Sequence, residues 1–132
     1  MNKGGLAAAL FVVGDCGFLV VAAVIAAVNR HQRTDKGFGP ALGPDAARTA
    51  PERFRRAGFA VLEGRSDWRF GADDREIQME MLAGWAGAAR EIGIDPSILD
   101  EWLGERRDHA TAGRSQMRVG HVDFFASPTG RR

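Results

Sequence analysis

The feature that most constrains the fold is an apolar run at the start of the chain. Residues 4–28, GGLAAALFVVGDCGFLVVAAVIAAV, carry one charge, Asp15, over a length that could cross a bilayer. An ionised carboxylate near the bilayer centre costs roughly 3 kcal/mol, and the Gly-Asp-Cys-Gly stretch has the composition of a turn. We therefore favour a buried strand over 8–14 and a short helix over 19–31, with a membrane span as the alternative.

Composition indicates one ordinary domain and excludes several classes of site. The 132 residues are 45% hydrophobic with a formal charge of +1, so no global field attracts nucleic acid or anionic lipid. Cys16 is the only cysteine, which excludes an intramolecular disulfide and a cysteine-built metal site. The three histidines lie too far apart in sequence for a metal motif. We expect no metal and a cytoplasmic location, or the inner membrane if 4–28 is a span.

Helices are predicted in three further places. Gly-Pro pairs predict a loop over 37–44, and a helix follows up to Gly58, with Pro51 starting its second piece. The strongest helix is 74–92, capped by Asp73. Its apolar stripe is Ile77, Met81, Trp85, Ala88 and Ile92. A helix opening at Asp95-Pro96 and ending at Gly113 buries Leu99, Trp102 and Leu103.

Two further strands are predicted, over 59–70 and 115–126. Gly64 indicates a bulge or a close backbone approach in the first, and Trp68 is expected in the core. In the second, His121 and Asp123 share a face, which favours a structural hydrogen-bonded pair over catalysis. With the strand over 8–14, the pattern predicts the α/β class, with about three strands and flanking helices.

Four segments in this order resemble the carboxyl-terminal half of a family of bacterial class I S-adenosylmethionine-dependent methyltransferases. They are VNRHQRTDKGFGPALGP, GFAVLEGRSDWRFG, LAGWAGAAREIG and RSQMRVGHVDFFA, spanning about Val28 to Ala126. AALFVVG stands where the family has its fifth strand, whereas CGFLVVAAVIAAV departs from the polar loop found there. The resemblance divides the chain into an apolar lead segment, 1–28, and a methyltransferase-like region, 29–132.

The resemblance implies the C-terminal portion of a Rossmann-like methyltransferase fold, with the N-terminal half of the sheet missing. That half carries the glycine-rich donor loop and the acidic ribose-binding residue, and we find neither here. We therefore expect a truncated family member with little or no activity alone. S-adenosylmethionine is the cofactor of the full-length family, and we expect none to bind this chain alone.

The loop over 29–44 would then lie near the pocket of an unknown methyl acceptor. The substrate-binding residues predicted on this basis are His31, Asp35, Lys36, Phe38, Asp67 and Trp68. Composition alone would favour a solvated helix end for the first of these. The sequence assigns no catalytic residue and no cofactor-binding residue.

Two alternatives remain open for the partners of this chain. A non-enzymatic remnant or assembly partner could add strand 8–14 to a separately encoded donor-binding half. A small membrane-anchored protein would use 4–28 as its span. Binding to nucleic acid is not expected, because acidic residues interleave with the arginines of 52–56 and 104–109.

Overall fold

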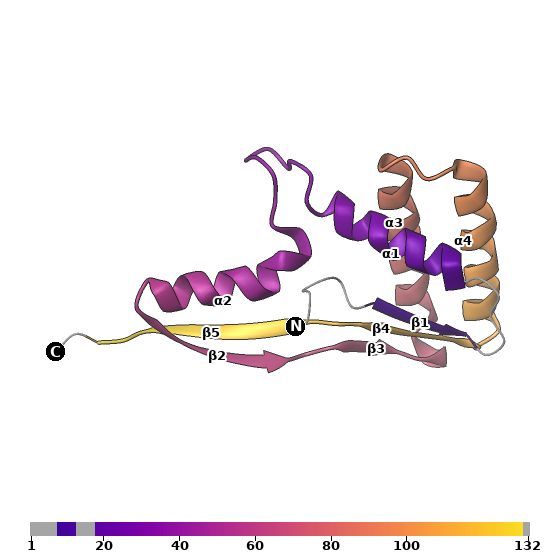
Figure 1. Ribbon diagram of the computed structural model, residues 1–132. Helices are drawn as coiled ribbons and strands as arrows, with labels where there is room; N and C mark the ends of the chain where they lie inside the picture. Colours follow the sequence, from indigo (N-terminus) through magenta and orange to yellow (C-terminus); the bar gives the residue numbers. More distant parts are fainter. Residues whose placement is uncertain (1–7, 13–17, 131–132) are drawn as a thin grey trace.

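The structure is a computed structural model that describes residues 8–12 and 18–130, with its helices above long paired strands in the view of Figure 1. In chain order the elements are β1 (Ala8–Val12), α1 (Phe18–His31), the short 3-10 helix η1 (Gly43–Asp45), α2 (Ala46–Arg56), β2 (Phe59–Arg65), β3 (Trp68–Phe70), the 3-10 helix η2 (Ala72–Asp74), α3 (Arg75–Glu91), α4 (Pro96–Thr111), β4 (Ser115–Val119) and β5 (Val122–Pro128). The predicted mixture of helices and strands is confirmed.

The apolar opening forms a strand and a helix in the described residues, β1 and α1. Because a helix rises 1.5 Å per residue, the 14 residues of α1 extend about 21 Å, less than the thickness of a bilayer core. None of the described helices combines the length and the apolar character needed to cross a membrane.

The described strands pair only in the antiparallel sense. One sheet has the order β1-β4-β3, and the other contains β2 and β5. The α/β class is confirmed. A Rossmann-like sheet is mainly parallel, so the described strand pairings do not show that specific fold.

The pair β2–β5 and the pair β3–β4 follow one another as a long antiparallel ribbon, which joins the two sheets and is interrupted once. Arg65 pairs with Val122 and Trp68 with Val119, so two residues separate the paired segments on each side and the register does not change. The predicted strands 59–70 and 115–126 are therefore each divided in two. The predicted bulge at Gly64 is wrong, because this residue pairs with Asp123 in regular register.

The ribbon turns over at this break. Phe59 of β2 contacts α2, whereas Phe70 of β3 packs against the core formed by the other helices. Phe59 and Phe70 are 11 positions apart. Because side chains alternate between the two faces of a regular strand, these two would point to opposite faces. Figure 1 shows all four helices on one side of the strands, so the side-chain faces must exchange between β2 and β3. Asp67 lies at that point.

The main core lies between helices α1, α3 and α4 and the central strand β4. Its fully or nearly buried members are Val21, Val24, Ala27, Val28, Leu82, Trp85, Ala86, Ala89, Leu99, Trp102, Met117 and Val119. Trp102 and Leu99 of α4 are buried as predicted, and Leu103 is partly buried. This cluster fixes β4, and through it the neighbouring β3.

The apolar stripe predicted for α3 is correct in part. Trp85 is buried, and Met81 is partly buried, but 43% of Ile77 is exposed. Gln78 is buried in its place. The predicted cap by Asp73 is wrong, because Asp74 precedes α3 and makes no side-chain cap hydrogen bond to this helix. Its carboxylate instead accepts a hydrogen bond from the Gly71 N–H, at the start of η2, at 2.8 Å.

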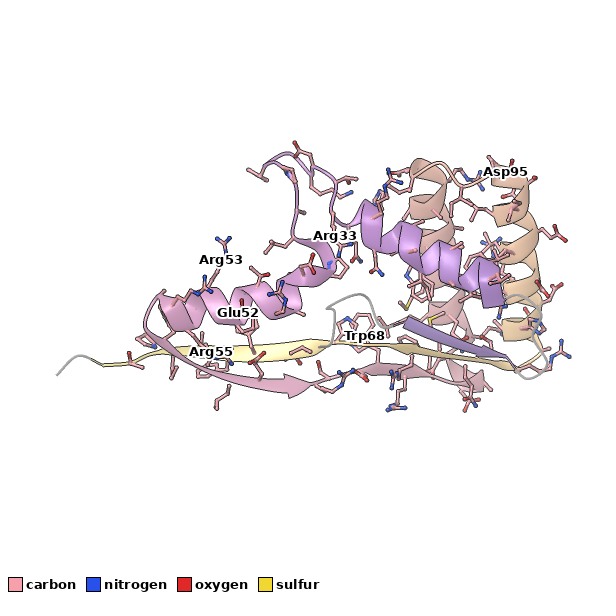
Figure 2. The ribbon with its side chains drawn as sticks, viewed as in Figure 1. Arg33, Glu52, Arg53, Arg55, Trp68 and Asp95 are labelled. Atoms are coloured by element: carbon pink, nitrogen blue, oxygen red, sulfur yellow. The ribbon has the colours of Figure 1, made fainter. Side chains whose placement is uncertain are left out.

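Helix α2 packs on the β2–β5 ribbon through an aromatic cluster. The Phe54 ring lies 5.4 Å from Phe59 and 5.5 Å from Phe124, measured between centroids. Arg55 of this helix also forms an ion pair with Glu63 of β2 (Figure 2). The predicted division of α2 at Pro51 is wrong, because the proline lies buried inside one helix and only removes one backbone hydrogen bond.

Candidate functional site

The motif after α1 forms a loop that is organised around Asp35. Its Oδ1 atom accepts hydrogen bonds from the backbone N–H groups of Gly37 at 2.7 Å and Gly39 at 2.9 Å. Both glycines have positive φ, 108° and 89°, which residues with a side chain rarely adopt. Phe38 stands between them and is completely exposed. The predicted binding residue Asp35 therefore shapes the loop that presents Phe38.

The two ends of this loop are held together at its base. Arg33 bonds to the Asp45 carboxylate at 3.1 Å and to the Asn29 carbonyl at 3.3 Å (Figure 2). Gly43 has a φ of 55°, and a Cβ atom there would lie 2.8 Å from Cγ of Arg33. The close approach explains why a glycine is required at this position.

His31 and Lys36 lie beside each other next to α3. Nε2 of His31 is 2.6 Å from Oε2 of Glu91, and Nζ of Lys36 is 3.5 Å from the same nitrogen. A nitrogen that donates its hydrogen to Glu91 cannot accept one from Lys36, so the shorter contact is the hydrogen bond. His31 thus joins the end of α1 to α3, besides the binding role that the sequence predicts for it.

Asp67 organises the break in the ribbon. One guanidinium nitrogen of Arg65 donates to both carboxylate oxygens, at 2.9 and 3.1 Å, and the backbone N–H of His121 donates to Oδ1 at 3.2 Å. Arg118 lies 3.9 Å away. The hydrogen bond from Arg65 lowers the pKa of Asp67, burial partly opposes this, and the His121 N–H lowers it further.

Trp68 and His121 stack on each other across this break. Their ring centroids are 4.2 Å apart with an angle of 30° between the planes. The expectation that Trp68 fills the core is wrong, because 49% of it is exposed. The expected pairing of His121 with Asp123 is also wrong: in the described residues, the histidine bonds to Val119 and Asp67 instead.

The predicted site residues thus form two groups. His31, Asp35, Lys36 and Phe38 belong to the loop and its base, whereas Asp67 and Trp68 lie at the ribbon break. Figure 2 shows Trp68 beside the strands and Arg33 at the foot of the loop. No hydrogen bond, ion pair or ring contact between described residues links the two groups directly.

His121 is the functional candidate that sequence reasoning assigned to another role. The only signal for it was its place in a predicted strand with polar neighbours, which does not reveal that it stacks on Trp68, the residue paired with Val119. Among the described residues, no group of three histidine, cysteine or acidic side chains could hold a metal ion.

Comparison with known proteins gave no match to a family model, to a curated protein or to a solved structure. The function is therefore inferred from the contacts of the Asp35 loop and of the ribbon break, together with the resemblance in the sequence.

Replacing Asp67 with asparagine is expected to destabilise the protein at neutral pH and to have little effect in acid. Because folding lowers this pKa below the ordinary value of 3.8, the stabilisation is complete above that value and is lost as pH falls through the lowered pKa. Urea unfolding of both proteins over a pH series measures the difference. The matched control is Asp123→Asn on β5, for which a small difference at neutral pH is expected. A difference for Asp67→Asn that persists in strong acid would contradict the assignment.

Proposed function

We propose that this chain is the acceptor-side part of a class I S-adenosylmethionine-dependent methyltransferase and transfers no methyl group on its own. The strongest support is the ordered loop built by the motif NRHQRTDKGFGPALGP. Arg33, Asp35 and Gly43 of this motif maintain the loop shape, which leaves Phe38 exposed. A segment whose shape depends on its own side chains fits a binding loop better than a linker.

The described residues do not fit the methyl donor. Nucleotide cofactors bind such folds at the carboxyl ends of parallel strands, with a glycine-rich turn for close approach and an acidic residue for the ribose. The described strand pairings are antiparallel, and no such turn with its acidic partner occurs in them. Methyl transfer requires donor and acceptor to be held together, so the reaction needs a donor site from elsewhere.

A second candidate is supported by the position of β1. This strand pairs with β4 along one edge, and no other described strand pairs with it. A strand from a separately encoded donor-binding half could add there and extend the sheet. In that case the chain is an assembly partner and has no catalytic role alone.

Isothermal titration with S-adenosylmethionine tests both candidates. The chain alone is expected to give no binding heat, since the donor site is not among its described residues. Micromolar binding by the chain alone would contradict the proposal. In a second arm, a donor-binding half of a related methyltransferase is titrated with this chain. Formation of a complex supports strand addition, and its absence favours an isolated remnant.

A further inference from the structure

Trp68 differs from the other two tryptophans of the chain in its exposure. Trp85 and Trp102 are 7% and 2% exposed and belong to the core, whereas Trp68 is 49% exposed. Tryptophan combines a large apolar surface with a polar edge, and such residues are enriched where proteins bind ligands and partners. The exposed indole therefore needs an explanation other than core packing.

The indole is held in a defined position on the strand. His121 stacks on it, and Phe70 contacts it nearly edge-on, with centroids 6.2 Å apart and an interplanar angle of 67°. Since Phe70 packs against the main core, the orientation of Trp68 is coupled to that core. A ring fixed in this way loses little conformational entropy when a ligand packs against it.

The hydrogen bonds of His121 determine which of its ring nitrogens is free to accept. Nδ1 lies 3.2 Å from the carbonyl oxygen of Val119. A carbonyl oxygen can only accept, so Nδ1 carries the hydrogen and, in the neutral ring, Nε2 presents a lone pair. In the described part of the chain, no group forms a hydrogen bond with Nε2.

Asp67 fixes the backbone at the same point. Its carboxylate binds the His121 N–H and is itself held by Arg65, and only 11% of its side chain is exposed. This places the imidazole at the turn of the ribbon, where the paired strands leave two residues on each side outside the regular pairing. Asp67 therefore acts as a positioning residue for His121.

We propose that His121 and Trp68 form a binding site for a planar ring that carries an O–H or N–H donor. The donor group of the ligand binds Nε2 of His121. The ligand ring lies beside the imidazole and packs on the part of the Trp68 indole that the smaller imidazole does not cover. Identifying this ring compound as the methyl acceptor rests on the proposed function, but its binding does not. Failure of the donor titration would therefore leave this site unaffected.

Phenol and its methyl ether, anisole, are matched probes for this site. They share the ring, and only phenol has a donor for Nε2. In NMR titrations of the whole chain, phenol is expected to shift the Trp68 indole and His121 imidazole signals. It should bind about fivefold more tightly than anisole, because one neutral hydrogen bond contributes about that factor. Equal affinity for the two probes, or shifts confined to other residues, would overturn the proposal.

Two variants separate the roles of the residues. His121→Phe preserves a ring against Trp68 and removes Nε2, so the affinity for phenol should fall to that for anisole. Trp68→Leu should weaken both probes. Leu62→Ala, at another exposed apolar position on the ribbon, is the control and should leave both affinities unchanged. If phenol keeps its advantage in a folded His121→Phe protein, the assignment of Nε2 is wrong.

Discussion

Replacing Trp102 with alanine should lower the free energy of unfolding by about 3–5 kcal/mol, as expected for truncation of a large buried aromatic side chain. Trp102 is 2% exposed and belongs to the cluster that includes Leu82 of α3 and Met117 of β4. The change removes apolar contacts and leaves a cavity that these rigid elements cannot fill. Urea denaturation followed by circular dichroism measures the loss, since a change in midpoint at constant slope reports stability.

Trp102→Phe distinguishes volume from polarity at this position. The indole Nε1 is buried and has no hydrogen-bond partner in the described part of the chain, so it adds a desolvation cost to the folded state. Phenylalanine removes that cost along with some volume, and should therefore destabilise much less than alanine. Equal losses for the two variants, or a loss under about 1 kcal/mol for alanine, would contradict the assignment of Trp102 to the core.

The two ends of α4 were predictable because their signals are local. Asp95 accepts hydrogen bonds from the N–H groups of Ser97 and Ile98 at the start of α4 (Figure 2). The hydrogen bond from the Ser97 hydroxyl lowers the pKa of the Asp95 carboxyl most, and the two backbone N–H groups lower it further. Gly113, with a φ of 69°, follows the end of the same helix. Both features depend on residues within one turn of the helix end, so the sequence contains them directly.

The strand breaks were not predictable because they depend on distant pairs. The 59–70 stretch has strand composition, and although Ser66 and Asp67 could turn the chain, the composition alone does not show that the strand ends there. The break occurs where the carboxylate meets the backbone of His121, which is 54 residues away. Trp68 was assigned to the core because of its hydrophobicity, and it does share a strand face with Phe70. Its place beside the break, where it stacks on His121, nevertheless leaves 49% of it exposed.

The candidate site follows the same division. The Asp35 loop contains its own hydrogen-bond partners within a few residues, so its motif indicates an ordered loop. The stacking of His121 on Trp68 joins two strands and is not apparent in either strand alone. The sequence therefore identified the loop and half of the ribbon site, and the pairing of β3 with β4 supplied the other half.

Gln78 is the position where the predicted and observed faces of α3 differ most, and it is the basis of a second stability prediction. Its Nε2 atom donates to the carbonyl oxygen of Gly71 at 2.7 Å and to that of Ser115 at 3.3 Å, and the residue is 1% exposed. It thereby joins the start of α3 to the start of β4. A stripe of apolar residues could not reveal this contact, because the amide is buried for its hydrogen bonds.

Gln78→Met keeps the length of the side chain and removes both hydrogen bonds. We expect the free energy of unfolding to fall by about 1 kcal/mol, because the Ser115 carbonyl loses this donor inside the protein. The Gly71 carbonyl still accepts from the Asp74 N–H, and removal of the buried, unpaired Oε1 of Gln78 offsets part of the loss. Urea denaturation measures the loss, and hydrogen exchange should show faster opening at the start of β4. Glu80→Met, on the exposed face of the same helix, is the control and should change stability by less than about 0.5 kcal/mol. If the two variants were equally stable, the amide of Gln78 would not be what joins α3 to β4, and the position of β3 beside them would depend on the apolar core alone.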